Sequence, residues 1–149
     1  MNDIHIDDFY KDSALILLQL YSQFPRKITL FVEDIAGPDT IDDFGLHSQR
    51  HLACFSTISW LEESGYLSYE DTIRQDAMDQ VVLSHKAFTL LASPASTPLQ
   101  ETHSELPESV AENLNTNVAQ LRNAVKSGSS HAINQRLREL LVLSRQHST

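Results

Sequence analysis

The sequence has few of the residues that cross-link a chain or anchor it in a membrane. Its one cysteine, Cys54, excludes an internal disulfide and fits a reducing compartment. Its four glycines are scattered and form no phosphate-binding loop. The longest apolar run, Ala14–Leu18, is far shorter than the roughly 18 residues of a membrane span, and the acidic start MNDIHIDDFY does not resemble a secretory signal. We therefore expect a cytoplasmic protein without membrane contact.

Cations are also scarce, and they are unevenly distributed. The 149 residues include 20 Asp and Glu against 11 Lys and Arg, for a net charge of −9. Met1–Ala95 carries 15 acidic and 6 basic side chains, whereas Ser96–Thr149 carries 5 of each. Nonspecific affinity for nucleic acid comes mainly from cations that neutralise phosphates, so we expect the first segment as a whole to repel a phosphate backbone.

The pattern of apolar residues predicts helices and short strands in one small domain, or in a domain with a helical appendage. Asp7 and Asp8 are expected to cap a largely buried first helix that ends before Pro25. Lys27–Val32 is rich in β-branched and aromatic residues, so it is predicted to be a strand. A short helix closed by Gly37, and then a loop, should follow.

The stretch GLHSQRHLACFSTISWLEESGYL predicts a longer helix that Gly65 ends. Its apolar residues recur at helical spacing, at Cys54, Phe55, Ile58 and Leu61. Beyond this helix, YLSYEDT and QVVLSHKAFTLL flank the polar stretch IRQDAMD. They are predicted to form the two strands of a hairpin, the second of which runs into an apolar tail.

The C-terminal third predicts a linker and a pair of helices. Residues 94–107 are rich in proline, serine and threonine, as linkers are. Residues 108–149 are predicted to form a helical hairpin in which Gly128 ends one helix and Ser130 caps the next. The apolar stripes of these helices need a covering surface, and we assign them to dimerisation or docking: Val110, Leu114, Val118, Leu121, Ile133, Leu137, Leu140 and Leu141.

This order of elements resembles that of a winged helix-turn-helix domain. WLEESGYL, Trp60–Leu67, looks like the end of a recognition helix and its turn into the wing. VVLSHKAFTLL, Val81–Leu91, is similar to the LT-x-K-G-x-x-L motif that ends the wing in many bacterial winged-helix proteins, with Ser84 for Thr and Ala87 for Gly. The resemblance implies an α+β, helix-rich fold, with a three-helix core and a β-hairpin wing over residues 1–93.

The resemblance also implies that His47–Trp60 is the recognition helix and Thr72–Gln80 the wing. In DNA-binding members the first turns and the outer face of this helix reach base edges, and Gln and Arg suit adenine and guanine. Base contacts would come from Ser48, Gln49, Arg50, Ser56 and Thr57, and phosphate contacts chiefly from Arg26, Lys27 and Arg74. The wing has only one cation against three aspartates, which departs from the pattern of a wing that follows phosphates.

Two further patterns raise the question of metal binding or catalysis. His47, His51 and Cys54 are spaced at i, i+4 and i+7 and are ligand types that hold zinc. Position 48 is Ser, however, where the zinc-protease motif H-E-x-x-H requires Glu, and a core position for Cys54 explains the spacing better. Paired acids such as Asp42 and Asp43 are explained by capping and solvation. We therefore predict no metal, no other cofactor and no catalytic residue.

Two functions follow from these patterns, and neither is enzymatic. The first is a homodimeric DNA-binding protein of transcription regulation, in which the helix His47–Trp60 reads DNA and the C-terminal helices dimerise. The second is a protein-interaction module whose acidic face meets a basic partner. Double-stranded DNA is the partner that the fold resemblance implies and that the acidity disfavours. Trp60 is expected in the core rather than as an exposed anchor for a partner.

Overall fold

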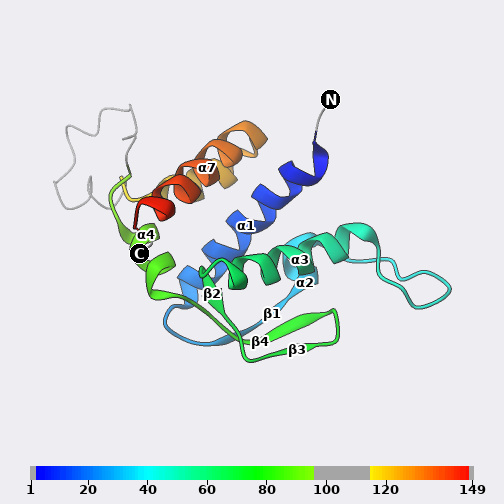
Figure 1. The fold of residues 1–149 in the computed structure, drawn as a ribbon. Coiled ribbons are helices and arrows are strands. Elements are labelled where there is room, and N and C mark those ends of the chain that lie inside the picture. The colour runs from blue at the N-terminus through cyan, green and yellow to red at the C-terminus, as the bar shows by residue number, and fades with distance from the viewer. Residues whose placement is uncertain (1–2, 96–114, 148–149) are drawn as a thin grey trace.

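A long first helix, α1 (Ile4–Gln23), crosses the middle of the molecule (Figure 1). The computed structural model describes residues 3–95 and 115–147. The elements that follow α1 are β1 (Ile28–Phe31), α2 (Val32–Ala36), α3 (Gln49–Glu63), β2 (Leu67–Ser68), β3 (Asp71–Ile73), β4 (Ala77–Leu83), α4 (His85–Ala92), α6 (Asn117–Ser127) and α7 (Ser130–His147). The described part is an α+β, helix-rich fold, as the sequence predicts.

The ends of α1 show which local signals decide a helix boundary. The helix begins at Ile4 with Asp3 in the N-cap position, although the Asp3 side chain makes no capping hydrogen bond. The prediction that Asp7 and Asp8 are the caps is therefore wrong. Acids are also favourable inside the first turns, where they face the positive end of the helix dipole. The helix ends at Gln23 because Pro25 has no N–H to donate and its ring clashes with a helical backbone.

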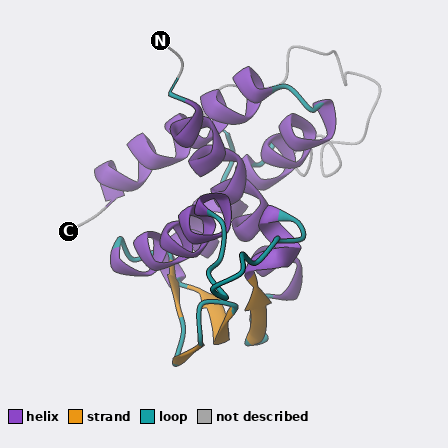
Figure 2. Ribbon diagram, turned by 90° about the vertical axis from the view of Figure 1, so that its right-hand side faces the viewer, coloured by secondary structure: helices purple, strands orange, loops and turns teal. Residues whose placement is uncertain are grey.

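The four strands form a small antiparallel sheet in which β4 is central. On one side β4 pairs with β1, with Leu30 opposite Met78. On the other side it pairs with both short strands, with Thr72 opposite Met78 and Leu67 opposite Leu83. Figure 2 shows the strands gathered at one end of the molecule and the helices at the other.

The predicted hairpin differs from the observed one in its strand limits. YLSYEDT forms two short strands instead of one, and β4 begins at Ala77, inside the predicted polar connection. The apolar tail is helix α4, because the Ser84 side chain accepts a hydrogen bond from the Ala87 backbone N–H at 3.1 Å and so caps a helix at that point. Ala87, Leu90 and Leu91 then recur at helical spacing and are buried.

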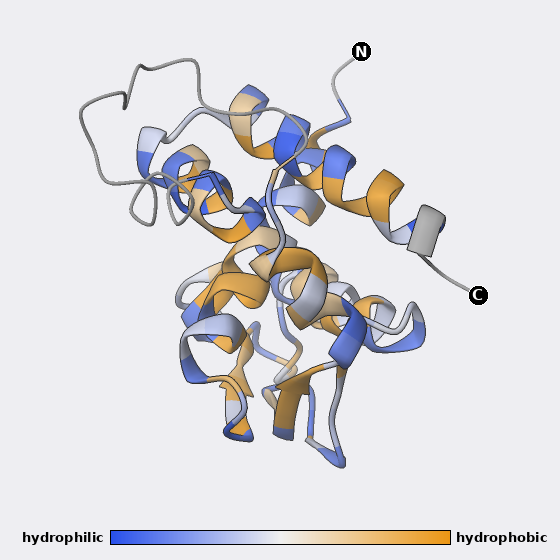
Figure 3. Cartoon of the chain, turned by 90° about the vertical axis from the view of Figure 1, so that its left-hand side faces the viewer, coloured by the Kyte–Doolittle hydropathy of each residue, from blue (hydrophilic) through white to orange (hydrophobic). Residues whose placement is uncertain are grey.

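Helices α6 and α7 form the predicted helical hairpin, and they pack against α1 and α4 of the same chain. Gly128 ends α6 in the left-handed conformation, with φ of 71°. The side chain that caps α7 is that of Ser129, not of Ser130 as predicted, and it accepts from the Ala132 N–H at 3.2 Å. Figure 3 shows hydrophobic and hydrophilic residues alternating along α7, the helix that leads to the C-terminus.

The residues assigned to dimerisation lie in this chain's own core. Five of them are buried there, namely Val118, Leu121, Ile133, Leu137 and Leu140, and Leu141 packs partly buried against the same cluster. Val110, Leu114 and residues 96–107 of the predicted linker lie outside the described residues. The covering surface that the apolar stripes required is thus supplied by α1 and α4 rather than by a second chain.

No helix within residues 3–95 and 115–147 combines the length and the apolar character that crossing a bilayer requires.

Gln120 in α6 is a buried amide without a hydrogen bond to the part of the chain that the structure describes. It is 1% exposed, and neither its side-chain oxygen nor its nitrogen has a partner there. Burying an unsatisfied amide costs free energy that an apolar side chain of similar shape does not. We expect Gln120→Met to raise the free energy of unfolding by about 1–2 kcal/mol, as measured by urea denaturation. Gln49→Met, at an exposed helical position, should change it little, and a destabilised Gln120→Met would contradict the prediction.

Candidate functional site

The connection between α2 and α3 is fastened to the start of α3 through Asp39. The Asp39 Oδ1 atom accepts a hydrogen bond from the Ser48 hydroxyl, and Oδ2 accepts one from the Ser48 backbone N–H at 3.3 Å. The Ser48 Oγ atom in turn accepts from the His51 N–H at 3.1 Å, which makes Ser48 the N-cap of α3. The hydrogen bond from the Ser48 hydroxyl is the main cause that lowers the pKa of Asp39 to about 2, so this carboxylate is fully ionised at neutral pH.

Two histidine rings stack beside Asp39. The rings of His47 and His51 lie 3.9 Å apart between centroids and are inclined by only 6°. The His47 Nδ1 atom is 2.8 Å from Asp39 Oδ2, and its Nε2 is 3.0 Å from Asp76 Oδ1 in the turn between β3 and β4. The His51 Nε2 atom is 2.7 Å from the carbonyl oxygen of Gln75 in the same turn. The two histidines therefore join the α2–α3 connection to the β3–β4 turn.

The structure brings together two of the three residues in the predicted His-Cys pattern. His47 and His51 meet with Asp39 as a third ligand type, whereas Cys54 faces the core and is fully buried. Burial is the main cause that raises the pKa of the Cys54 thiol to about 12, and the Asp12 carboxylate adds to it. Cys54 is therefore a core residue, as expected. Sequence spacing missed Asp39 because a loop, and not a helical turn, carries it to the histidines.

Arg50, a predicted reader of DNA bases, is held by two aspartates of α1. Its guanidinium donates to both oxygens of Asp12, at 2.7 and 2.5 Å, and its Nε is 3.7 Å from Asp8. The Asp12 side chain is only 1% exposed, so Arg50 neutralises a buried carboxylate. The hydrogen bonds with Asp12 also raise the pKa of Arg50 above its usual value. The arginine is thus part of the joint between α1 and α3.

The other predicted DNA-contacting residues of α3 are divided between its two faces. Thr57 is buried and its hydroxyl donates to the Ala53 carbonyl oxygen at 3.0 Å, so it cannot reach a base. Ser48 is engaged with Asp39 and His51 as described above. Gln49 and Ser56 do lie on the exposed face. Their exposed neighbours on this face are Ala53, Trp60 and Glu63, which carry no positive charge.

The predicted phosphate-contacting residues do not gather around Arg50. Arg26 and Lys27 precede β1, and Lys27 is 3.7 Å from Glu70 in an exposed ion pair. Arg74 lies in the β3–β4 turn, close in sequence to Asp71 and Asp76, and is exposed. Arg50 is the only lysine or arginine in the α3 sequence, and it points to α1. The basic surface that a DNA reader needs is therefore not assembled on α3.

Trp60 differs from its predicted core position. Its side chain is 41% exposed at the outer face of α3. One edge of the ring meets Phe9 of α1, with the ring centroids 5.2 Å apart in a T-shaped arrangement. The indole therefore closes the edge of the α1–α3 contact and leaves its other side on the surface.

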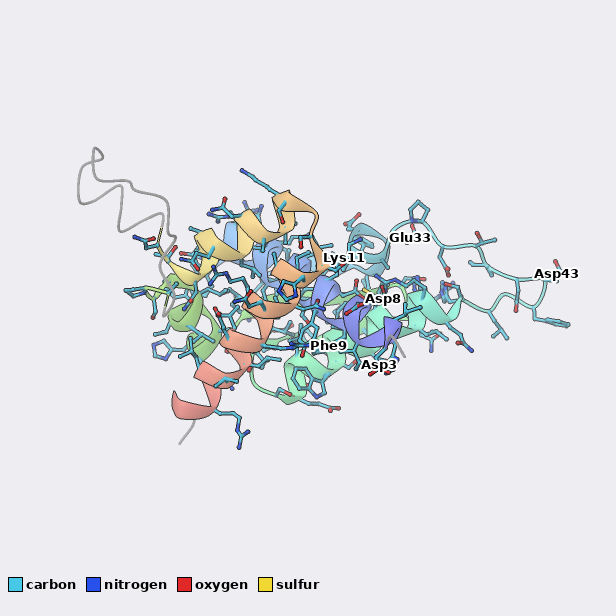
Figure 4. The ribbon with its side chains drawn as sticks, turned by 90° about the horizontal axis from the view of Figure 1, so that it is seen from above. Asp3, Asp8, Phe9, Lys11, Glu33 and Asp43 are labelled. Carbon is cyan, nitrogen blue, oxygen red and sulfur yellow. The ribbon has the colours of Figure 1, made fainter. Side chains whose placement is uncertain are left out.

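The tip of the α2–α3 connection displays apolar side chains on an ordered turn. The Asp42 carboxylate accepts from the backbone N–H groups of Phe44 and Leu46, both at 2.9 Å, and the Asp42 N–H donates to the Leu46 carbonyl oxygen at 3.0 Å. Gly45 lies within this turn at φ of 76°, a conformation that glycine adopts without strain. Phe44 is 88% exposed, and Ile41 and Leu46 are more than half exposed. Figure 4 shows Asp43 at the far end of this connection, away from the helices.

Comparison of the chain with protein-family models, with curated proteins and with solved structures found no match.

The Arg50–Asp12 pair generates a prediction about stability. Arg50→Ala would leave the Asp12 carboxylate buried without its partner, so we expect it to lower the free energy of unfolding by about 3 kcal/mol in urea denaturation. Arg26→Ala is the matched control, because it removes an exposed arginine and should change stability by less than about 0.5 kcal/mol. Equal stability of the two variants would show that Arg50 has no structural role.

Burial of Cys54 generates a prediction about reactivity. Since only the thiolate reacts with disulfide reagents and alkylating agents, a thiol whose pKa is raised to about 12 should be inert near neutral pH. We expect the native protein to react with a thiol-specific chromogenic disulfide only as fast as it unfolds, and the protein in guanidinium chloride to react at once and completely. Rapid stoichiometric reaction of the native protein would contradict the buried position.

Proposed function

We propose that this protein is a non-catalytic protein-interaction module built on a winged-helix-like arrangement, and that the tip of its α2–α3 connection contacts the partner. The order of the elements from α1 to β4, and an antiparallel sheet in which the last strand pairs with the earlier ones, support the winged-helix part. The observation that carries the interaction part is the exposure of Phe44. The ordered turn at Asp42 keeps this side chain 88% exposed, next in sequence to Asp43, which lies away from the helices (Figure 4).

An apolar cluster of this kind favours a protein surface as its partner. Exposed single apolar residues are common, but Ile41, Phe44 and Leu46 lie within six residues of each other on one turn. Aromatic side chains are enriched among the residues that dominate protein–protein binding energy. Because the Asp42 carboxylate fixes the turn, less conformational entropy is lost when Phe44 enters a pocket.

The charges around the tip indicate the chemistry of the partner. Asp42 and Asp43 flank the apolar side chains, and the exposed Glu33 and Asp34 of α2 precede the connection. A basic protein with an apolar pocket complements such a surface, because opposite charges accelerate association and Phe44 contributes the desolvated contact. The same acidic side chains would repel the phosphate backbone of DNA. The arginine at the start of α3, Arg50, would not offset this repulsion, because it points toward α1.

Photo-crosslinking tests this proposal and identifies the partner. A photoreactive phenylalanine analogue at position 44 should crosslink to one basic protein in the source cells. The same group at position 126, an exposed lysine of α6, should not. With that partner purified, Phe44→Ser should weaken binding about thirtyfold, as expected for an aromatic residue that dominates an interface. Ile73→Ser, which removes an exposed apolar residue of β3, is the matched control and should leave the affinity unchanged.

A parallel measurement distinguishes the DNA-binding alternative. Fluorescence anisotropy with duplex DNA at low salt should show no binding by the wild-type chain. Binding to duplex DNA that Phe44→Ser leaves intact, together with the absence of a position-dependent crosslink, would overturn the proposal and favour a DNA-binding regulator.

A further inference from the structure

The hydrogen bonds of His47 and His51 fix where their ring protons lie. The His51 Nε2 atom is 2.7 Å from the Gln75 carbonyl oxygen, which can only accept, so Nε2 carries the proton. The His47 Nε2 atom is 3.0 Å from the Asp76 carboxylate, which also accepts when it is ionised. A neutral imidazole has one N–H, so the Nδ1 atom of a neutral His51 presents a lone pair. His47, in contrast, has a carboxylate oxygen within hydrogen-bond distance of each of its ring nitrogens.

The Nδ1 atoms of both rings lie near the same carboxylate oxygen. Asp39 Oδ2 is 2.8 Å from His47 Nδ1 and 3.7 Å from His51 Nδ1. The His51 side chain is 1% exposed, and its Nδ1 has no hydrogen-bond partner within residues 3–95 and 115–147. One ligand atom from each of Asp39, His47 and His51 lies within 4.8 Å of the others. A buried lone pair without a partner costs free energy, and a cation among these three groups would satisfy it.

Additional protons on the two histidines would not satisfy all of these groups. A second proton on His47 would satisfy Asp39 and Asp76 but would leave the buried Nδ1 of His51 without a partner. A second proton on both histidines would stack two positively charged rings 3.9 Å apart. A single divalent cation, in contrast, would be bound by Asp39 Oδ2 and both Nδ1 atoms at once.

We propose that Asp39, His47 and His51 form a binding site for a divalent transition-metal ion, through Asp39 Oδ2 and the two Nδ1 atoms. Two imidazoles and one carboxylate are ligands that Zn²⁺ prefers, and tetrahedral Zn²⁺ holds its ligand atoms about 3.3 Å from each other. The separations of His47 Nδ1 and His51 Nδ1 from Asp39 Oδ2, 2.8 and 3.7 Å, lie on either side of that value. Because a metal ion binds in the plane of an imidazole and the two rings are stacked and nearly parallel, binding requires the rings to turn out of their stack.

The surroundings of the three ligands suit a metal in two further respects. Metal-binding histidines usually donate their other N–H to a carboxylate or a backbone carbonyl, and Asp76 and Gln75 hold these positions. A shallow pocket of about 190 Å³ is lined by Asp39, Ser48 and His51, which gives an ion and a fourth, solvent ligand access. The bound ion would join the α2–α3 connection, α3 and the β3–β4 turn, so its role is structural.

Metal titration of the full-length, tag-free chain, after treatment with a chelator, tests the site. Competition with a fluorescent zinc indicator should show one equivalent of Zn²⁺ bound, and the ion should raise the midpoint of thermal unfolding. Co²⁺ in its place should give the visible absorption bands of a four-coordinate ion. NMR should show the metal-dependent shift on the Nδ1 atoms of both histidines, with Nε2 still protonated.

Variants separate this site from other metal-binding groups on the chain. Asp76→Asn alters only an exposed supporting carboxylate and should weaken Zn²⁺ binding about tenfold to a hundredfold. His47→Gln removes a ligand at the edge of the core and should weaken it further, while circular dichroism confirms the fold. His131→Gln, an exposed histidine of α7, should leave the affinity unchanged. Failure of the wild-type chain to bind micromolar Zn²⁺, or equal binding by His47→Gln and His131→Gln, would overturn the proposal.

Discussion

The contact between α1 and α3 contains one buried ion pair, that of Asp12 with Arg50. Helix α1 packs against α3 on one side and against α6 and α7 on the other, so most of its surface is inside the molecule. Asp12 lies on this inner surface, and a buried carboxylate is costly unless a partner neutralises it and satisfies its lone pairs. The two hydrogen bonds from Arg50 do both. This requirement sets the direction in which the first turn of α3 faces, and Asp39, His47 and His51 are positioned by that turn.

The direction in which Arg50 points distinguishes α3 from a helix that reads DNA. In a helix that reads DNA, arginine at the second position would extend outward to bases or phosphates. In this chain the arginine is directed inward, and the outward positions carry a glutamine, an alanine, a serine, a tryptophan and a glutamate. The candidate features near the start of α3 are instead the exposed apolar tip at Phe44 and the buried cluster of Asp39, His47 and His51. Apart from His51, these residues belong to the long connection that precedes α3, so the proposed functions concern that connection rather than the outer face of the helix.

Local signals in the sequence predict the elements well and the site only in part. Gly65, Gly128 and Pro25 each mark an observed helix end because their backbone chemistry acts within a few residues. Serine is a typical N-cap residue, so the start of α4 at Ser84 can be recognised in the sequence. The β-branched residues just before Ser84, however, favour a strand that continues past it. The spacing of His47 and His51 predicts that they meet on one helix face, but His47 precedes the N-cap Ser48, and its contacts with Asp39 and Asp76 place its ring instead. Their contacts with Asp39 and Asp76, like that of Arg50 with Asp12, join residues from separate elements, and no local pattern contains that information.

The burial of the α6–α7 stripes against α1 and α4 bears on how the chain divides into folding units. Leu17, Leu91, Leu121 and Leu137 belong to one continuous apolar cluster, and the Tyr66 hydroxyl is hydrogen-bonded to Ser144 of α7. A boundary placed at the Pro- and Ser-rich composition near residue 94 would therefore cut through a single core. A fragment that ended there would bury a smaller share of its surface, as short chains do. The proline-rich composition marks a connection along the chain, but the two segments that it joins share one apolar core, so we expect them to unfold together.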